Sequence, residues 1–314
     1  HKISFIILYK HGLHIDITPS ISRLDIQIPS NNARKFRILW FIPYLMTKNL
    51  DTDGLCSIAH RYDLFYIDLW GVVHNGIKLY ESAIGTLKEL KRNNKDFVLL
   101  TNAPRPNDTV KKFLEKMGME EELRDHVFTS GEAALNYLKK SYSSKKFFHI
   151  GPPRDFDLFN PFKKNKSSDL LDSEYLLCTG LFDDHDNDLN YYKNLFEAHI
   201  HKKMICTNPD LIVDRGNVRE LCAGSVAMVF EKMGGEVVYF GKPHAEVYNL
   251  SIDNLDKRTL AIGDNLNTDI KGANLLNYDS LLISNGIHKL EILNKGISET
   301  VSYTHLRAHE THRY

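Results

Sequence analysis

The sequence predicts an α/β protein: a Rossmann-like core built on a parallel sheet, with a large α/β cap domain inserted into it. Two features of the sequence support this prediction. Short apolar runs alternate along the chain with longer segments of helical periodicity, which is the order of strands and helices in proteins with a parallel sheet. Several apolar runs also end in polar residues, and open α/β sheets bind their ligands at the carboxyl ends of the strands.

The first part of the core is predicted between Tyr62 and Thr101 as strand, loop, helix and strand. The helix spans Ser82–Asn93, because Ile84, Leu87 and Leu90 recur at helical spacing. A helix, a short strand and a further helix are predicted next, at Thr109–Met117, Val127–Thr129 and Gly131–Lys140. We assign residues 46–131 and 235–300 to this core.

A second series of strands and helices occupies the middle of the chain. Strands are predicted at Lys146–Ile150, Tyr175–Cys178 and Met204–Cys206, and a helix at Asp188–His201. None of the four polar strand-end motifs described below lies within this middle segment of the chain. Residues 132–234 are therefore predicted to form a separate α/β domain inserted into the core.

The two ends of the chain differ from the rest. Residues 1–45 precede the first methionine, Met46, and lack clear periodicity, although Phe5–Tyr9 could form a strand. We interpret them as translated upstream sequence, with a targeting peptide as the alternative. Residues 301–314 resemble translated adapter sequence, and a histidine-rich metal tract is the alternative interpretation. Both ends are excluded from the predicted fold.

The composition excludes several classes of function. Lys and Arg together number 40, as do Asp and Glu, so the chain lacks the basic footprint of a nucleic-acid-binding protein. The longest apolar stretch, Ile38–Met46, contains Pro43 and is too short to span a bilayer. The four cysteines form no CxxC pair and suit reduced thiols. We expect a cytoplasmic protein that binds a small molecule, with neither nucleic acid nor membrane as partner.

Polar residues follow four of the predicted strands. They are Asp68 after Leu64–Ile67, Thr101 and Asn102 after Val98–Leu100, Lys242 after Val237–Phe240, and Asp264 with Asp269 after Leu260–Ile262. Each motif alone is as typical of a turn or a helix cap as of a functional site. Four such motifs in this order predict that acids, a hydroxyl group and a lysine meet at one edge of the sheet.

This set of residues is typical of phosphate and metal chemistry. The carboxylate of Asp68 is the candidate nucleophile, which would attack phosphorus and form an aspartyl-phosphate. Asp264 and Asp269 offer the oxygen ligands that Mg²⁺ prefers. Lys242 would neutralise Asp68 and the phosphate group, whose charge the metal would also stabilise.

Further contacts to the phosphate group are predicted from the loops after the strands. Thr101 offers a hydroxyl group. The turns at Gly71 and Asn102 offer backbone N–H groups, which can form an anion-binding nest. Catalysis is therefore predicted to involve Asp68, Lys242 and Thr101, with Gly71 and Asn102 binding the substrate.

With these motifs in place, the chain resembles the haloacid dehalogenase-like (HAD) superfamily of phosphohydrolases. The order Asp68, Thr101, Lys242, Asp264 and Asp269 matches the four motifs of that superfamily, over about residues 58–290. The α/β insertion is similar to the large cap of subclass IIA, which includes phosphatases of small metabolites. The string Asp-Leu-Trp-Gly-Val, with Trp in place of the usual second Asp, resembles a poorly characterised bacterial branch.

The resemblance implies a metal site and one departure from the family pattern. Mg²⁺ would be bound by Asp68, by the backbone carbonyl of Trp70 and by Asp264, with Asp269 in the outer shell. Family phosphatases carry an acid two residues after the nucleophile, where this chain has Trp70. Because a positioned acid or base contributes about 10²–10⁴-fold to rate, alkyl phosphates should be poor substrates.

Three outcomes of this replacement stay open. The protein could act on acyl or anhydride phosphates, whose leaving groups need no proton. It could use another acid, with His74 as the nearest candidate in sequence. It could also bind a phosphorylated metabolite without turnover. A different family chemistry, the cleavage of phosphonates or halides, is a further alternative.

Substrate choice is predicted to depend on the cap, whose loops close over the site. Asn208 and Asp210, which follow a predicted cap strand, are candidate substrate contacts, and a structural turn is the alternative. Arg105 could bind a second anionic group of the substrate. The resemblance also suggests a homodimer that forms through the cap.

Overall fold

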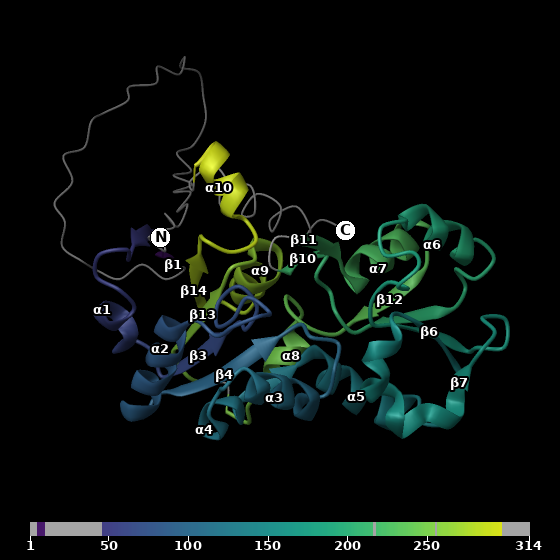
Figure 1. The fold of residues 1–314 in the computed structure, drawn as a ribbon, viewed down its shortest axis with the longest axis horizontal. Helices are drawn as coiled ribbons and strands as arrows, with labels where there is room; N and C mark the ends of the chain where they lie inside the picture. Colours follow the sequence, from purple (N-terminus) through teal and green to yellow (C-terminus); the bar gives the residue numbers. More distant parts are fainter. Residues whose placement is uncertain (1–4, 10–45, 216–217, 255, 297–314) are drawn as a thin grey trace, which may run out of the picture.

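The structure is a computed structural model that describes residues 5–9, 46–215, 218–254 and 256–296 of the 314-residue chain. Two sheets with helices around them make up the molecule, and a two-stranded hairpin lies where they meet (Figure 1). The predicted α/β fold with a parallel-sheet core is confirmed. The tail at residues 301–314, and most of the segment before Met46, lie outside the described residues.

The core sheet has seven strands in the order β2-β1-β14-β13-β3-β4-β5. Its parallel strands are β3 (Leu64–Ile67), β4 (Asp96–Thr101), β5 (Val127–Thr129), β13 (Thr259–Gly263) and β14 (Asp279–Ile283). Ile67 lies opposite both Ile262 and Leu99, so three strands end at the same edge of the sheet. Their side chains are buried on both faces, as is typical of parallel strands.

The helices of the core cover these two faces. Alternate residues of β3 divide between the faces, with Phe65 and Ile67 in one apolar cluster and Tyr66 in the other. The first face is covered by α2 (Glu81–Arg92), α3 (Asn107–Lys116) and α4 (Glu121–Arg124), and the second by α5 (Ser130–Ser141), α8 (Ala245–Asn249) and α9 (Lys271–Leu275). The remaining helices are the short α1 (Cys56–Ala59), the π-helix η2 (Leu266–Ile270) and α10 (Lys289–Lys295). The predicted helices α2, α3 and α5 are confirmed to within about two residues.

The second sheet is parallel, with its five strands in the order β12-β9-β8-β6-β7. They are β6 (Phe147–Ile150), β7 (Lys166–Ser167), β8 (Tyr175–Cys178), β9 (Lys203–Cys206) and β12 (Glu236–Tyr239). Helices α6 (Leu189–Phe196) and α7 (Ala223–Lys232) pack together on one face, and the 3-10 segment η1 (Pro153–Asn165) follows β6. The hairpin consists of β10 (Ile212–Arg215) and β11 (Val218–Leu221).

Two strands lie elsewhere than predicted. We assigned β12, which precedes Lys242, to the core, but it pairs with β9 in the second sheet. An apolar run carries no information about which of two parallel sheets it joins, so the sequence could not decide this. The predicted strand at Phe5–Tyr9 (β1) is confirmed, and it pairs antiparallel with β14 and with β2 (Met46–Asn49). Its place in the core sheet corrects our exclusion of that part of residues 1–45.

The two sheets share one apolar cluster. It joins Tyr66 and Val98 of the core sheet, through Leu138 of α5, to Phe147 and Tyr175 of the second sheet. All four cysteines are free thiols. Among the described residues, every helix is too short or too polar to cross a bilayer. The shared cluster means that the edge where β3 and β13 end keeps a fixed place relative to the second sheet.

The core sheet should depend strongly on Leu99, whose side chain is fully buried in the first apolar cluster. We expect Leu99→Ala to lower the free energy of unfolding by about 2–5 kcal/mol, because it removes buried methyl groups and leaves a cavity. The control is Leu293→Ala in α10, where the side chain is 70% exposed and the expected change is within about 0.5 kcal/mol. Urea unfolding would measure both values, and equal values would contradict the assignment of the core.

Candidate active site

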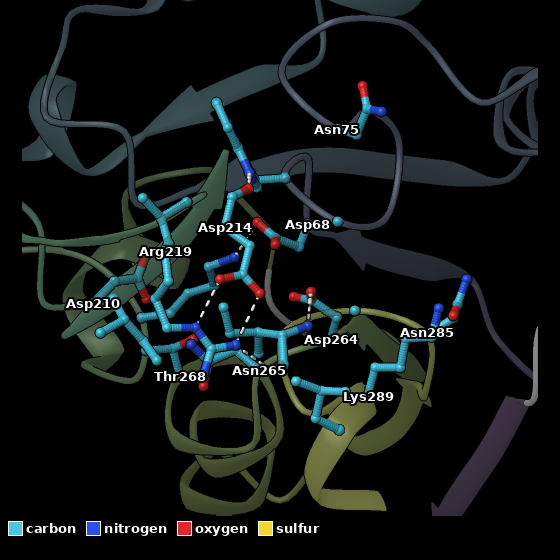
Figure 2. A pocket seen from close by; sticks show the side chains of 18 of the residues that line it. Asp68, Asn75, Asp210, Asp214, Arg219, Asp264, Asn265, Thr268, Asn285 and Lys289 are labelled. Carbon is cyan, nitrogen blue, oxygen red and sulfur yellow. Dashed lines mark hydrogen bonds and ion pairs between the residues drawn. The ribbon is translucent and has the colours of Figure 1, made fainter. Parts of the chain in front are cut away.

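A cavity of about 300 Å³ lies between the core and the hairpin β10–β11 (Figure 2). The core contributes Asp68, Trp70, Gly71, Asp264 and Thr268, among others, to its lining. The cap side contributes Asp210, Ile212, Val213, Asp214 and Arg219. Lys242, which follows β12, completes the wall between them. Residues from three of the four predicted strand ends, Asp68, Lys242 and Asp264, therefore meet at this pocket.

Lys242 is the centre of the charged cluster. Its ammonium group lies 2.6 Å from Oδ1 of Asp68 and 2.7 Å from Oδ1 of Asp269, and it donates a hydrogen bond to the carbonyl of Leu100. Lys242 is only 4% exposed, so these contacts replace nearly all of its hydration. Burial alone would lower the pKa of Lys242, but the carboxylates of Asp269 and Asp68 raise it above its ordinary value.

Asn102 fixes the backbone of Lys242. Its Oδ1 accepts a hydrogen bond from Lys242 N at 2.7 Å, and its Nδ2 donates to Lys242 O at 3.0 Å. The same Nδ2 group donates to Oδ1 of Asp210 at 3.1 Å. Asn102 thus joins the end of β4 to two residues that arrive from the second sheet. Its buried side chain holds the lysine, a role distinct from the predicted contact with substrate.

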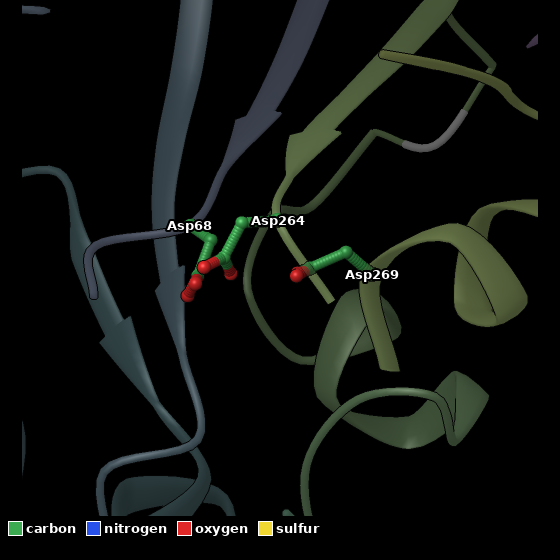
Figure 3. A group of neighbouring side chains, drawn as sticks. All are labelled: Asp68, Asp264 and Asp269. Atoms are coloured by element: carbon green, nitrogen blue, oxygen red, sulfur yellow. The ribbon is translucent and has the colours of Figure 1, made fainter. Parts of the chain in front are cut away.

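Three carboxylates lie together at the ends of β3 and β13 (Figure 3). Asp68, Asp264 and Asp269 each place one carboxylate oxygen within 4.8 Å of the others. Asp264 accepts a hydrogen bond from the N–H of Ile287 at 2.9 Å, and Asp269 accepts one from Asn265 at 3.1 Å. Both carboxylates are therefore oriented by the backbone before any ligand binds.

Glycines make this close approach possible. A Cβ atom on Gly71, whose φ is +79°, would lie 2.2 Å from Oδ2 of Asp264. A Cβ on Gly286 would lie 2.0 Å from the same oxygen, and a Cβ on Gly263 would lie 2.0 Å from Cγ of Asp269. Each of these glycines leaves space that a carboxylate fills. The sequence predicts Gly71 as a backbone donor to substrate, and the structure adds that it makes room for Asp264.

The crowded acids repel one another. Burial raises the pKa of Asp68 to about 7, with Lys242 opposing the rise and Asp269 adding to it. Burial, followed by the charges of Asp68 and Asp269, raises the pKa of Asp264 well above its ordinary value. A divalent cation would relieve this repulsion, and carboxylate oxygens are ligands that Mg²⁺ favours. The residues present therefore fit the predicted metal site at Asp68, Asp264 and Asp269.

Of three further predicted site residues, Asp210 and Trp70 line the pocket and Thr101 does not. Asp210 lines the pocket, where burial raises its pKa to about 6. Thr101 is buried at the end of β4, and its hydroxyl accepts a hydrogen bond from Ala103 N at 3.3 Å. Trp70 lines the pocket, and the role of its carbonyl as a metal ligand stays a prediction.

Two predicted substrate contacts are engaged elsewhere. Arg105 donates to Asp155 of η1 at 2.9 Å, and neither residue belongs to the pocket lining. Asp155 is only 4% exposed, so its charge needs a cation, and Arg105 supplies one. Asn208 accepts a hydrogen bond from Asp210 N at 3.0 Å and so forms the structural turn that was the alternative interpretation.

His74 is poorly placed to act as the missing acid. Its side chain is buried against the rings of Trp70 and Phe113, and its Nδ1 accepts a hydrogen bond from Gly76 N at 3.0 Å. Burial lowers the pKa of His74 to about 4, so the ring is neutral near pH 7. It is also absent from the pocket lining.

Several lining residues escaped prediction from sequence. They include Asn75, Tyr80, Arg219, Asn285 and Lys289. Arg219 belongs to the hairpin, for which a signal did exist. The pair Gly216-Asn217 separates two short runs and is typical of a two-residue turn between strands. Asn285 and Lys289 follow β14, whose end carries no charged motif in the sequence.

Two family models match the sequence of this chain. One, described as haloacid dehalogenase-like hydrolase, matches residues 65–160, and another, described as HAD-hydrolase-like, matches residues 239–307. A solved structure of a haloacid dehalogenase-like hydrolase from Brucella suis 1330 is 32% identical, with a TM-score of 0.69. That match covers 74% of this chain and 89% of the Brucella chain.

Two curated proteins of Bacillus subtilis (strain 168) are also similar. The 5′-nucleotidase YutF is 23% identical over 239 residues, which is 73% of this chain and 90% of that protein. The sugar-phosphatase AraL is 26% identical over 230 residues, which is 71% of this chain and 83% of that protein.

The glycine at position 71 gives a direct test of the metal site. We expect Gly71→Ala to weaken Mg²⁺ binding by about 10–100-fold, because the new Cβ would displace Asp264. The control is Gly118→Ala, where φ is +88° and a Cβ would meet no atom within 4 Å. Both changes strain the backbone, but only the first crowds a carboxylate. Calorimetric titration with Mg²⁺ would measure the affinities, and equal affinities would contradict the site.

The buried histidine predicts a pH dependence of stability. Between pH 6.5 and 4 the unfolded chain protonates His74 while the folded protein keeps it neutral, so stability falls as the pH falls. We expect His74 to lower the free energy of unfolding by about 1.5 kcal/mol between pH 6.5 and pH 5. In His74→Asn, whose amide oxygen can accept from Gly76, the fall should be smaller by that amount. Urea unfolding at both pH values measures the free energy of unfolding of each protein. If the free energy fell equally in both proteins, His74 would not be held neutral in the folded state.

Proposed function

Because the chain belongs to the haloacid dehalogenase-like family of hydrolases, we propose that it is a Mg²⁺-dependent phosphohydrolase of small phosphorylated metabolites. The observation that carries the proposal is the carboxylate of Asp68, held 2.6 Å from Lys242 at a pocket with two further carboxylates. The similar proteins YutF and AraL are a 5′-nucleotidase and a sugar-phosphatase. Their substrates carry a phosphate group, which supports the same class here.

The proposed reaction has two steps on Asp68. Its carboxylate attacks phosphorus, so that a bond from oxygen to phosphorus forms while the bond to the leaving group breaks. Water then hydrolyses the aspartyl-phosphate and releases inorganic phosphate. Lys242 holds Oδ1 of Asp68 and offsets negative charge in both steps. Asp68 and Asp264 would hold Mg²⁺, which would supply positive charge that reduces the repulsion between phosphate and carboxylates.

The lack of an acid at position 70 narrows the class of substrate, because it limits which leaving groups can depart. The second residue after Asp68 is Trp70, whose indole has no acidic proton to give and donates its N–H to Asp214 O at 2.8 Å. Alkyl alkoxides need protonation as they leave, whereas acyl, anhydride and aryl groups depart as weaker bases. We therefore propose that acyl, anhydride or aryl phosphates are better substrates than alkyl phosphates.

A binding protein without turnover is the second candidate function. The engagement of Trp70 with the hairpin favours it, because the usual acid is absent and its place is filled by a structural contact. The cluster of Asp68, Asp264, Asp269 and Lys242 opposes it. Binding of phosphate alone would be served better by fewer negative charges, since carboxylates repel the anion.

Phosphate release from acyl, aryl and alkyl phosphates, with and without Mg²⁺, tests the proposal on the full chain. We expect metal-dependent release, fastest for the acyl and aryl compounds. Asp68→Asn should abolish it by removing the nucleophile. The matched control is Asp63→Asn at the other end of β3, where Asp63 pairs with Arg258 on the surface, and activity should persist.

The alternatives predict different results from the same experiment. A folded protein that binds Mg²⁺ but releases phosphate from none of the compounds would favour the binding protein. Equal rates for alkyl and acyl phosphates would contradict the assigned effect of Trp70, and would show that another group supplies the proton.

A further inference from the structure

Trp70 makes a contact that the phosphohydrolase reaction does not require. Its indole N–H donates to the backbone carbonyl of Asp214 at 2.8 Å, and Asp214 belongs to strand β10 of the hairpin. The guanidinium of Arg215 lies 5.4 Å from the centre of the indole ring, within range for a cation–π interaction. The residue two places after the nucleophile thus binds two successive residues of the cap side.

The indole ring is held firmly on the core side. A Cβ on Gly76, whose φ is +83°, would lie 2.6 Å from the ring, so glycine lets the loop pack directly against it. The His74 ring packs edge-on to the indole, with the ring centres 5.1 Å apart. Phe113 of α3 in turn packs against His74. The core therefore fixes the position of the indole ring, and the hairpin is positioned by its contact with this ring.

A second contact ties the hairpin to the metal site. Arg219 of β11 makes two hydrogen bonds to the carboxylate of Asp214 and donates a third to the carbonyl of Ile287 at 3.1 Å. The N–H of Ile287 donates to Asp264, a predicted metal ligand. The hairpin is attached to the core at two points, on Trp70 and on Ile287, and both residues line the pocket.

The hairpin is one wall of the pocket. Ile212, Val213 and Asp214, three successive residues of β10, line the cavity. Its volume of about 300 Å³ is at the lower end of the usual range for ligand pockets. The position of β10 therefore decides how much space is left for the part of the substrate beyond the phosphate group.

We propose that Trp70 is a specificity-determining residue: its indole fixes the hairpin β10–β11 as the pocket wall and restricts the site to compact substrates. The inference rests on the proposed function, since it concerns the substrate of the same site. It assigns the side chain at this position a role in selection by size, separate from the metal ligation predicted for its backbone carbonyl.

The test compares a compact and a bulky phosphate compound. In an Asp68→Asn background, which prevents turnover, the dissociation constants of phenyl phosphate and adenosine 5′-monophosphate are measured by calorimetry with Mg²⁺ present. Trp70→Phe keeps a ring and removes the N–H donor. Because a net hydrogen bond is worth about a fivefold change in an equilibrium, we expect the preference for phenyl phosphate to fall about fivefold.

A second variant perturbs the contact from the hairpin side. Arg215→Met removes the cation over the ring together with the surface ion pair to Glu220. It leaves the core unchanged, so it perturbs the hairpin side even if Trp70→Phe fails to fold. We expect the same preference to fall about threefold. Arg258→Met, at a remote surface ion pair, is the control and should change nothing.

Hydrogen exchange of residues 211–221 in the full chain gives a readout independent of substrate. We expect these amides to exchange about fivefold faster in Trp70→Phe, with the strands of the core unchanged. An unchanged preference between the two compounds, in both variants, would overturn the proposal, whatever the exchange rates. A lack of phosphate release by the wild type would instead count against the proposed function, because neither readout depends on turnover.

Discussion

The buried ammonium group of Lys242 is the interaction on which the site depends. Three carboxylates lie within 4.8 Å of one another around it, and two of them contact it directly. Removing one partner of a buried ion pair leaves an uncompensated charge, which costs about 3–5 kcal/mol. Without the lysine, Asp68 and Asp269 would have to protonate, separate or bind another cation. The lysine therefore holds Asp68 and Asp269 in the positions that the proposed reaction needs.

Because of this lysine, the candidate active site is formed by residues from both sheets. Asp68 and Asp264 follow strands of the core, but Lys242 follows an edge strand of the second sheet. Asn102 bonds both backbone groups of Lys242, and the shared apolar cluster holds the sheets together. A shift of the second sheet would move the ammonium group that balances the charge of Asp68. The charge on Asp68 is thus coupled to the packing between the domains.

The sequence predicted which charged residues come together better than it predicted how strands and distant loops pair. Asp68, Asp264 and Lys242 could be found because buried strand ends rarely carry charge without a partner, and their order placed them at one edge. The sheet that contains β12 could not be found, since both sheets contain parallel strands formed by short apolar runs. Nor could the partner of Arg105, because Asp155 lies 50 residues away in a segment without a periodic pattern. Pairings between distant loops depend on the finished packing.

Trp70 shows why a replaced residue has to be interpreted through its contacts. Judged from the sequence alone, Trp70 only removes the acid that family phosphatases carry, since an indole gives no proton to a leaving group. In the structure the same side chain joins a loop of the core to the wall of the pocket. An aspartate at this position would be too short to make either contact, and its charge would add to three carboxylates that already repel one another. Under the proposed function, the tryptophan would give up acid catalysis in exchange for a fixed pocket wall, and leaving groups that need no proton would suit both properties.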